Sequence, residues 1–169
     1  MPPAVDIGAA LAHMVEGLRS QLAQKPLMIG IHTGGAWVAD WLHQALALSE
    51  PLGNLDISFY RDDFTRLGMN PQVKTSNLPV NIDDRHVILV DDVLHTGRTV
   101  RAALNEIFDY GRPASVILAA LIVRDGRELP IQADIVGQAI TLNRHQHIKL
   151  VRASNPATPF ELTVQEIAG

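Results

Sequence analysis

The 169-residue sequence contains no cysteine, which excludes disulfide frameworks, thiolate zinc sites, iron–sulfur clusters and cysteine nucleophiles. It also lacks a long hydrophobic run. The longest one, residues 116–123, is far shorter than the roughly 20 residues that a membrane-spanning helix needs. No basic stretch followed by an apolar one begins the chain, so we expect no secretory signal. These absences predict a cytoplasmic protein that does not bind a membrane.

Aromatic residues make up only 5% of the sequence and charged residues 19%, whereas 47% of the residues are hydrophobic. This composition supports a buried core and differs from that of a disordered chain. The formal net charge is −4. The sequence contains no basic tract of the kind that would predict a nucleic-acid-binding surface. The length favours a single domain over residues 1–169.

Hydrophobic periodicity divides the chain into helices and strands. Residues 6–24 have apolar side chains at helical spacing, with Asp6 near the N-cap and Pro26 ending the helix. Four apolar segments are predicted to be strands: residues 27–32, 55–60, 86–91 and 115–123. Strands that are apolar throughout and alternate with helices indicate an α/β fold, in which a mostly parallel sheet is flanked by helices.

Three further segments complete this prediction. Residues 49–54 are predicted to be a loop, residues 61–77 a long polar loop, and residues 160–164 an edge strand. The helix after the third strand is expected to bury a stripe that includes Phe108. Trp37 and Trp41 lie four residues apart, which is typical of a core or subunit interface.

The segment VILVDDVLHTGRT, residues 87–99, carries the clearest chemical pattern. In sheets of this class, ligands bind at the carboxyl ends of strands, and the N-termini of helices bind anions. The amides of residues 96–99 and the hydroxyls of Thr96 and Thr99 suit a phosphate. Asp91 and Asp92 suit vicinal hydroxyls or a hydrated magnesium ion. A sugar phosphate satisfies both halves of the pattern.

VILVDDVLHTGRT resembles the phosphoribosyl pyrophosphate (PRPP) signature of the type I phosphoribosyltransferases. Three other segments resemble the pyrimidine operon regulator (PyrR) family, whose members are also uracil phosphoribosyltransferases. They are LDISFYRDD at 55–63, GRTVRAALNEIFDYGRPASV at 97–116 and RELPIQADIVGQ at 127–138. The resemblance implies a type I phosphoribosyltransferase fold with a core at about residues 27–142 and a flexible loop. The first helix and the C-terminal segment would form a small hood.

The resemblance also implies roles for individual residues. Asp91, Asp92 and Arg61 would be catalytic, and the two aspartates would hold a metal indirectly, through water and PRPP. The remaining residues belong to four groups: the phosphate loop (Thr96, Gly97, Arg98 and Thr99), the pyrophosphate loop (His32, Thr33, Gly34 and Gly35), the flexible loop (Tyr60, Asp62 and Asp63), and the base pocket (Arg124, Arg127, Ile135 and Val136).

At two positions the sequence departs from the family pattern. Gly34 stands where members of the family often carry arginine, which removes a contact to pyrophosphate. Ile135 stands where an aromatic residue is common, so uracil is expected to meet an aliphatic side chain instead of a ring.

The activity implied is the formation of UMP and pyrophosphate from uracil and PRPP, with Mg²⁺ as cofactor. UMP or UTP, leader RNA of pyrimidine genes and a second copy of the chain are the other implied partners, as a homodimer or higher homo-oligomer. The predicted RNA footprint consists of scattered basic residues: Arg124, Arg127, Arg144, Lys149 and Arg152, with His13 and Arg19 of the first helix.

Two alternatives stay open. The chain could be a regulator that senses PRPP and UMP with little turnover, or a phosphoribosyltransferase for a purine base. A metal site made of histidines is not expected, because the sequence has no cysteine and no helical pair of histidines four residues apart. His43, His86, His145 and His147 are therefore interpreted as surface histidines.

Overall fold

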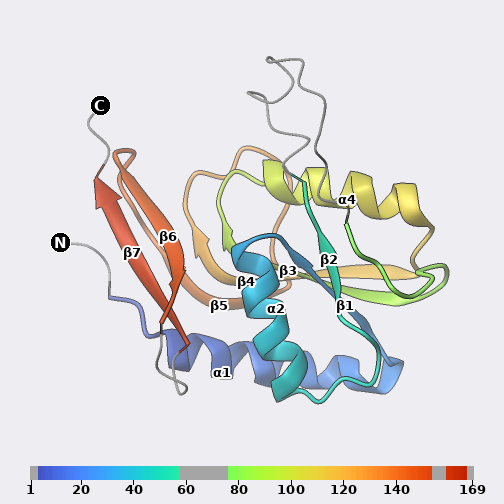
Figure 1. The fold of residues 1–169 in the computed structure, drawn as a ribbon. Coiled ribbons are helices and arrows are strands. Elements are labelled where there is room, and N and C mark those ends of the chain that lie inside the picture. The colour runs from blue at the N-terminus through green and yellow to red at the C-terminus, as the bar shows by residue number, and fades with distance from the viewer. Residues whose placement is uncertain (1–3, 58–75, 154–158, 167–169) are drawn as a thin grey trace.

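The computed structural model describes residues 4–57, 76–153 and 159–166. Its centre is a five-stranded sheet in the order β2-β1-β3-β4-β5, and all its neighbouring strands are parallel (Figure 1). The strands are β1 (Leu27–Ile31), β2 (Gly53–Leu55), β3 (His86–Leu94), β4 (Ser115–Arg124) and β5 (Ile135–Ile140). The predicted α/β architecture is confirmed.

Helices cover both faces of this sheet (Figure 1). Helix α1 (Ile7–Leu18) and helix α2 (Gly34–Ala45) lie on one face, and helix α4 (Arg98–Tyr110) lies on the other. The predicted cap of α1 is confirmed, because the Asp6 carboxylate accepts a 3.0 Å hydrogen bond from the Ala9 amide. The first helix is shorter than predicted, since a 3₁₀ helix, η1 (Arg19–Gln24), follows α1 before Pro26.

Two hydrophobic clusters fill the space between the sheet and the helices. The cluster beneath α1 and α2 includes Leu11, Met14 and Leu42, all at most 1% exposed. The cluster beneath α4 includes Val100 and Ile107, which are equally buried. Because both faces of each central strand are covered, the strands are apolar throughout instead of alternating.

A separate antiparallel hairpin stands beside the sheet, formed by β6 (Gln146–Arg152) and β7 (Phe160–Glu166) (Figure 1). The strand predicted at residues 160–164 is present, but it pairs with β6 and not with the central sheet. Leu150 and Phe160 belong to the cluster beneath α1 and α2, so the hairpin is packed onto the body of the protein. That α1 and the hairpin act as a hood over a substrate stays a prediction.

The structure corrects three local predictions. Strand β2 begins at Gly53, inside the predicted loop, and ends at Leu55, because pairing with β1 selects these residues. Strand β3 continues three residues past Asp91, since its pairing with β4 extends to Leu94 and Val123. Phe108 is 58% exposed, because the buried stripe of α4 runs through Ile107 and the next residue points away from it.

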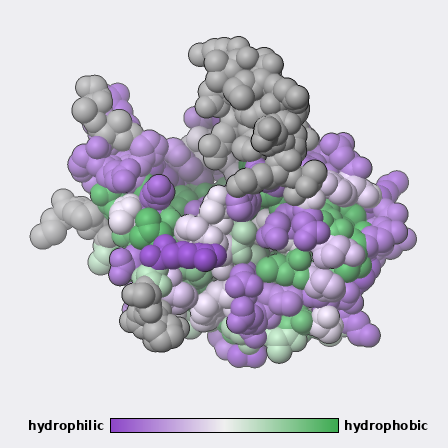
Figure 2. All heavy atoms as spheres, in the orientation of Figure 1, coloured by the Kyte–Doolittle hydropathy of each residue, from purple (hydrophilic) through white to green (hydrophobic). Residues whose placement is uncertain are grey.

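On the side that Figure 2 shows, the surface formed by the described residues carries no large apolar face. Polar residues cover most of that side, and apolar residues form small separate patches. Within the described residues, no helix is both long and apolar enough to span a membrane.

Candidate active site

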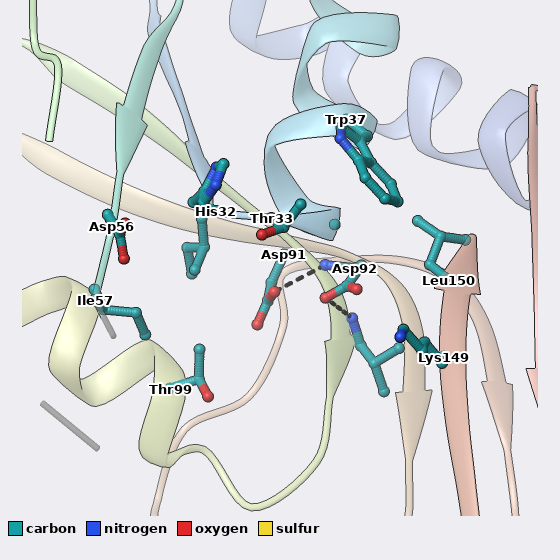
Figure 3. Close-up of a pocket in the computed structure, with 13 residues that line it drawn as sticks. His32, Thr33, Trp37, Asp56, Ile57, Asp91, Asp92, Thr99, Lys149 and Leu150 are labelled. Atoms are coloured by element: carbon teal, nitrogen blue, oxygen red, sulfur yellow. Dashed lines mark hydrogen bonds between the residues drawn. The ribbon is translucent and has the colours of Figure 1, made fainter. Parts of the chain in front are cut away.

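The strand order places a topological switch point between β1 and β3, where ligands bind in open α/β sheets. A cavity of about 680 Å³, the main cavity, opens there, at the carboxyl ends of these two strands (Figure 3). Its walls come from four parts of the chain: the end of β1 and the start of α2 (Ile31, His32, Thr33, Gly34 and Trp37), the segment after β2 (Asp56 and Ile57), β3 with α4 (Asp91, Asp92, Val93 and Thr99), and β6 (Lys149 and Leu150).

The predicted pyrophosphate loop connects β1 to α2 and lies on the main cavity. The His32 amide donates to the carbonyl oxygen of Leu55 at 2.8 Å, which fixes the loop to the end of β2. His32, Thr33 and Gly34 line the cavity, whereas Gly35 lies behind them. A Cβ atom on Gly34 would come within 2.7 Å of the Asp92 carboxyl carbon. Glycine at this position therefore leaves room for the Asp92 carboxylate.

Asp91 and Asp92 lie side by side on β3, and both face the main cavity (Figure 3). Asp91 is only 4% exposed, and its carboxylate accepts a 2.9 Å hydrogen bond from the Asp92 amide. Burial raises the pKa of Asp91 well above its usual value, and the neighbouring charge of Asp92 raises it further. A cation or a hydroxyl donor at this carboxylate would offset the cost of burying its charge.

The predicted phosphate loop forms the turn before α4. Gly97 has a φ of 97°, a left-handed conformation that glycine adopts without strain. The hydroxyl of Thr96 accepts a 3.1 Å hydrogen bond from the Arg98 amide, whereas Thr99 lines the main cavity. The Arg98 side chain points elsewhere, because its guanidinium forms a 2.9 Å ion pair with exposed Glu128.

A second cavity, of about 330 Å³, adjoins the end of β4. Three of the four predicted base-pocket residues, Arg124, Arg127 and Val136, line it together with His95. Burial and the nearby Arg124 charge lower the pKa of His95. The fourth predicted residue, Ile135, is not among its lining. Ile135 faces α1, where its Cδ1 atom is 3.0 Å from the position that a Cβ on Gly17 would take.

Arg124 is a buried cation, with 7% of its surface exposed. Its Nη1 donates to the carbonyl oxygen of Gln146 at 3.0 Å. Its Nε has no hydrogen-bond partner among the described residues. A buried donor without a partner is costly, and the Arg124 side chain also lines the second cavity.

The residues of the predicted RNA footprint lie in different surroundings, and the footprint itself stays a prediction. Arg124 is buried, Arg127 lines the second cavity, and Lys149 lines the main cavity. The Arg152 guanidinium lies over the Trp37 ring, 4.7 Å from its centroid. Arg144 is exposed on the turn before β6. Of these five cations, only Arg124 is buried, and the other four are exposed.

Sequence reasoning did not assign Lys149, Leu150 or Asp56 to this site. Lys149 had no signal of its own, because strand β6 was not predicted and the position of the hairpin depends on tertiary packing. The flexible-loop residues Tyr60, Arg61, Asp62 and Asp63 lie outside the described residues, and their roles stay predictions.

The described residues contain no group of three or more His, Asp or Glu side chains that could hold a metal ion. His145 and His147 are exposed, whereas His43 and His86 are half-buried and form hydrogen bonds with the Glu50 carbonyl oxygen and the Ser115 hydroxyl. Asp91 and Asp92 supply hard carboxylate oxygens of the type that Mg²⁺ prefers, but two carboxylates do not fill an octahedral shell. The donor set therefore fits a magnesium ion whose other ligands are water and substrate oxygens.

The phosphoribosyl transferase domain model matches residues 4–151. The chain is 55% identical to the bifunctional protein PyrR of Nitrosococcus oceani over 172 residues, which cover 98% of this chain and 95% of that protein. It is 58% identical to the bifunctional protein PyrR of Pseudomonas paraeruginosa over 145 residues, which cover 83% and 85% of the two chains.

Solved phosphoribosyltransferase structures share the fold. A hypoxanthine-guanine-xanthine phosphoribosyltransferase superposes with a TM-score of 0.64 at 20% identity, covering 95% of this chain and 88% of that one. A purine phosphoribosyltransferase from Pyrococcus horikoshii gives a TM-score of 0.58 at 25% identity, with 80% of each chain covered. The type I phosphoribosyltransferase fold expected from the sequence is confirmed.

Proposed function

Because the chain belongs to the PyrR family of uracil phosphoribosyltransferases and pyrimidine operon regulators, we propose that it makes UMP in the two cavities at the carboxyl edge of the sheet. The main cavity would hold the ribose and diphosphate of PRPP, and the second cavity would hold uracil. The observation that carries this assignment is the meeting of three predicted groups in one cavity: the pyrophosphate loop, the Asp91–Asp92 pair and Thr99 of the phosphate loop.

The proposed reaction needs orientation more than proton transfer. N1 of uracil attacks the anomeric carbon of PRPP, the bond from that carbon to the diphosphate oxygen breaks, and pyrophosphate leaves. Positive charge develops on the ribose ring in an oxocarbenium-like transition state, as in glycoside hydrolysis. Asp91 and Asp92 face the place where the ribose would lie, so their carboxylates would accept hydrogen bonds from its hydroxyls and stabilise this charge.

Asp91 and Asp92 would also hold the hydrated Mg²⁺ that accompanies the diphosphate. When bound, this ion would neutralise charge on the leaving pyrophosphate. The raised pKa of Asp91 agrees with this role, because a buried carboxylate is stabilised by a nearby cation.

The second cavity offers polar and apolar contacts that suit a pyrimidine. Arg124 Nε is a buried donor that would bind a carbonyl oxygen of the base. Val136 and Ile131 supply apolar contacts for the ring. A base held here also leaves the Arg124 contact to Gln146 intact, because a different atom of the guanidinium makes it.

An assay with purified protein and PRPP tests the proposal. Radiolabelled uracil should give UMP in the presence of Mg²⁺ and much less after chelation with EDTA. Hypoxanthine and guanine should give little product. Preferential use of hypoxanthine or guanine would show that the substrate is a purine base and not uracil. Binding of UMP and PRPP without turnover of any base would instead identify a sensor that keeps the site.

The regulatory half of the family's function leads to a second proposal. We expect the chain to bind leader RNA of pyrimidine genes more tightly with UMP bound, as a homodimer that doubles the few exposed cations of each subunit. Filter binding at low salt, with and without UMP, should show retention of leader RNA above a scrambled control. Equal retention of both RNAs would remove RNA binding from the proposed function.

A further inference from the structure

The pyrophosphate loop of this chain carries no lysine or arginine. Its residues are His32, Thr33, Gly34 and Gly35, and the space where a side chain would leave Gly34 is taken by the Asp92 carboxylate. The loop can therefore supply backbone amides and the Thr33 hydroxyl, but no permanent positive charge.

The rest of the main cavity makes this shortage more severe. Three aspartates line it, Asp56, Asp91 and Asp92. A diphosphate is itself strongly anionic, and in this cavity it would lie beside the Asp91 and Asp92 side chains. Charge-assisted hydrogen bonds from a cationic side chain are the usual way in which proteins bind such groups.

Lys149 is the only lysine or arginine among the described residues that line the main cavity. Its side chain extends from β6 toward the Asp92 side of the cavity (Figure 3). None of the ion pairs between described residues involves its ammonium group. The cation is therefore available to an anionic ligand.

Contacts near both ends of β6 hold Lys149 over the cavity. At the start of the strand, buried Arg124 donates to the carbonyl oxygen of Gln146. At its end, the Arg152 guanidinium stacks on Trp37, a residue of α2 that also lines the cavity. Leu150, next to Lys149, is 3% exposed and packed in the core. The backbone that carries Lys149 is thus fixed relative to the pyrophosphate loop.

We propose that Lys149 binds the diphosphate of PRPP and the released pyrophosphate, and that it supplies from the hairpin the positive charge that the pyrophosphate loop lacks. This inference rests on the proposed function for the identity of the substrate. It differs from the sequence-based prediction, which placed Lys149 in an RNA footprint.

Two measurements on a Lys149→Gln variant test the proposal. Calorimetry with pyrophosphate and Mg²⁺ should show an affinity about tenfold or more below that of the unsubstituted protein, because one hydrogen bond between two charged groups is lost. The KM for PRPP should rise by a similar factor. The affinity for UMP should stay within about twofold, since UMP has no diphosphate.

Two further variants serve as controls. Lys149→Arg should restore most of the pyrophosphate affinity. Arg112→Gln removes one exposed positive charge just after α4, far from the main-cavity lining, and should leave pyrophosphate binding unchanged. Lys149→Gln protein that binds pyrophosphate normally, or that loses UMP and pyrophosphate affinity equally, would overturn the proposal. Loss of RNA binding with normal pyrophosphate affinity would overturn it as well and assign Lys149 to RNA.

The calorimetric result is independent of turnover. If the unsubstituted protein makes no UMP from uracil but binds pyrophosphate through Lys149, the proposed reaction fails and the role of Lys149 stands. If UMP forms and Lys149→Gln has no effect on pyrophosphate affinity or on the KM for PRPP, the reaction stands and the role of Lys149 fails.

Discussion

Arg124 at the end of β4 donates a 3.0 Å hydrogen bond to the carbonyl oxygen of Gln146 at the start of β6. The same side chain lines the second cavity, and its Nε has no hydrogen-bond partner among the described residues. The proposed base pocket and the strand that carries Lys149 are linked through this single buried side chain.

This link predicts different effects for the two arginines of the second cavity. Arg124→Ala should lower the free energy of unfolding by about 1–3 kcal/mol, because it leaves the Gln146 carbonyl unpaired, and it should also raise the KM for uracil. Arg127→Ala should raise the KM for uracil with little loss of stability, since Arg127 is exposed. Denaturant melts and initial rates would measure both effects. Equal stability of the two variants would contradict this division.

Ile135 and Val136 should respond differently to the same substitution. Ile135→Phe should cost about 1–3 kcal/mol of stability by overpacking against Gly17 of α1, while the KM for uracil stays unchanged. Val136→Phe should fill the second cavity and raise the KM for uracil at least tenfold. Thermal melts and uracil kinetics on both variants test which of the two β5 side chains faces the second cavity. A lower KM for uracil in Ile135→Phe would show that the ring reaches the base.

A methyl group at Gly34 should disturb Asp92. Gly34→Ala places a Cβ against the Asp92 carboxylate, so the rate of UMP formation should fall about tenfold or more while the fold is kept. Gly17→Ala is the matched control, because its new methyl group meets only the Ile135 side chain, at 3.0 Å from Cδ1 and 3.2 Å from Cγ2, and should leave the rate of UMP formation unchanged. A Gly34→Ala variant with full activity would show that Asp92 needs no such space.

The buried carboxylate of Asp91 should make stability depend on pH. Its pKa is raised in the folded protein, so the folded state binds the proton more tightly than the unfolded state. Stability should therefore fall as the pH rises from about 3.8 through the folded-state pKa, and remain at the lower level above it.

Asp91→Asn should abolish this loss of stability. The variant should be more stable than the unsubstituted protein at pH 7.5 and equally stable near pH 3.5, and its turnover should fall about hundredfold because a charge at the ribose is lost. Urea melts across this pH range measure the difference. If the difference in stability between Asp91→Asn and the unsubstituted protein does not change with pH, Asp91 is not the cause of the pH dependence.

Much of the fold could be predicted because its signals are local. The Asp6 cap, the apolar strands and the glycine turn at Gly97 depend on residues close together in the chain, and the structure confirms them. Strand β5 was not predicted, because Ile135 and Val136 were interpreted only as residues of the base pocket. Strand β6 was not predicted either, since the strand belongs to a small, partly exposed hairpin.

The sequence by itself determined the parallel α/β class, and it predicted a phosphate loop beside the Asp91–Asp92 pair. Hydrophobic period, caps and the positive φ of a glycine are set by near neighbours along the chain. Tertiary structure alone decided which side chains of β5 face the second cavity. Gly17 meets Ile135, and His13 Nδ1 donates to the Val136 carbonyl at 2.8 Å, so helix α1 fixes the orientation of a strand more than 100 residues away. The same kind of long-range packing places Lys149 in the main cavity, and no local pattern records contacts between such distant segments.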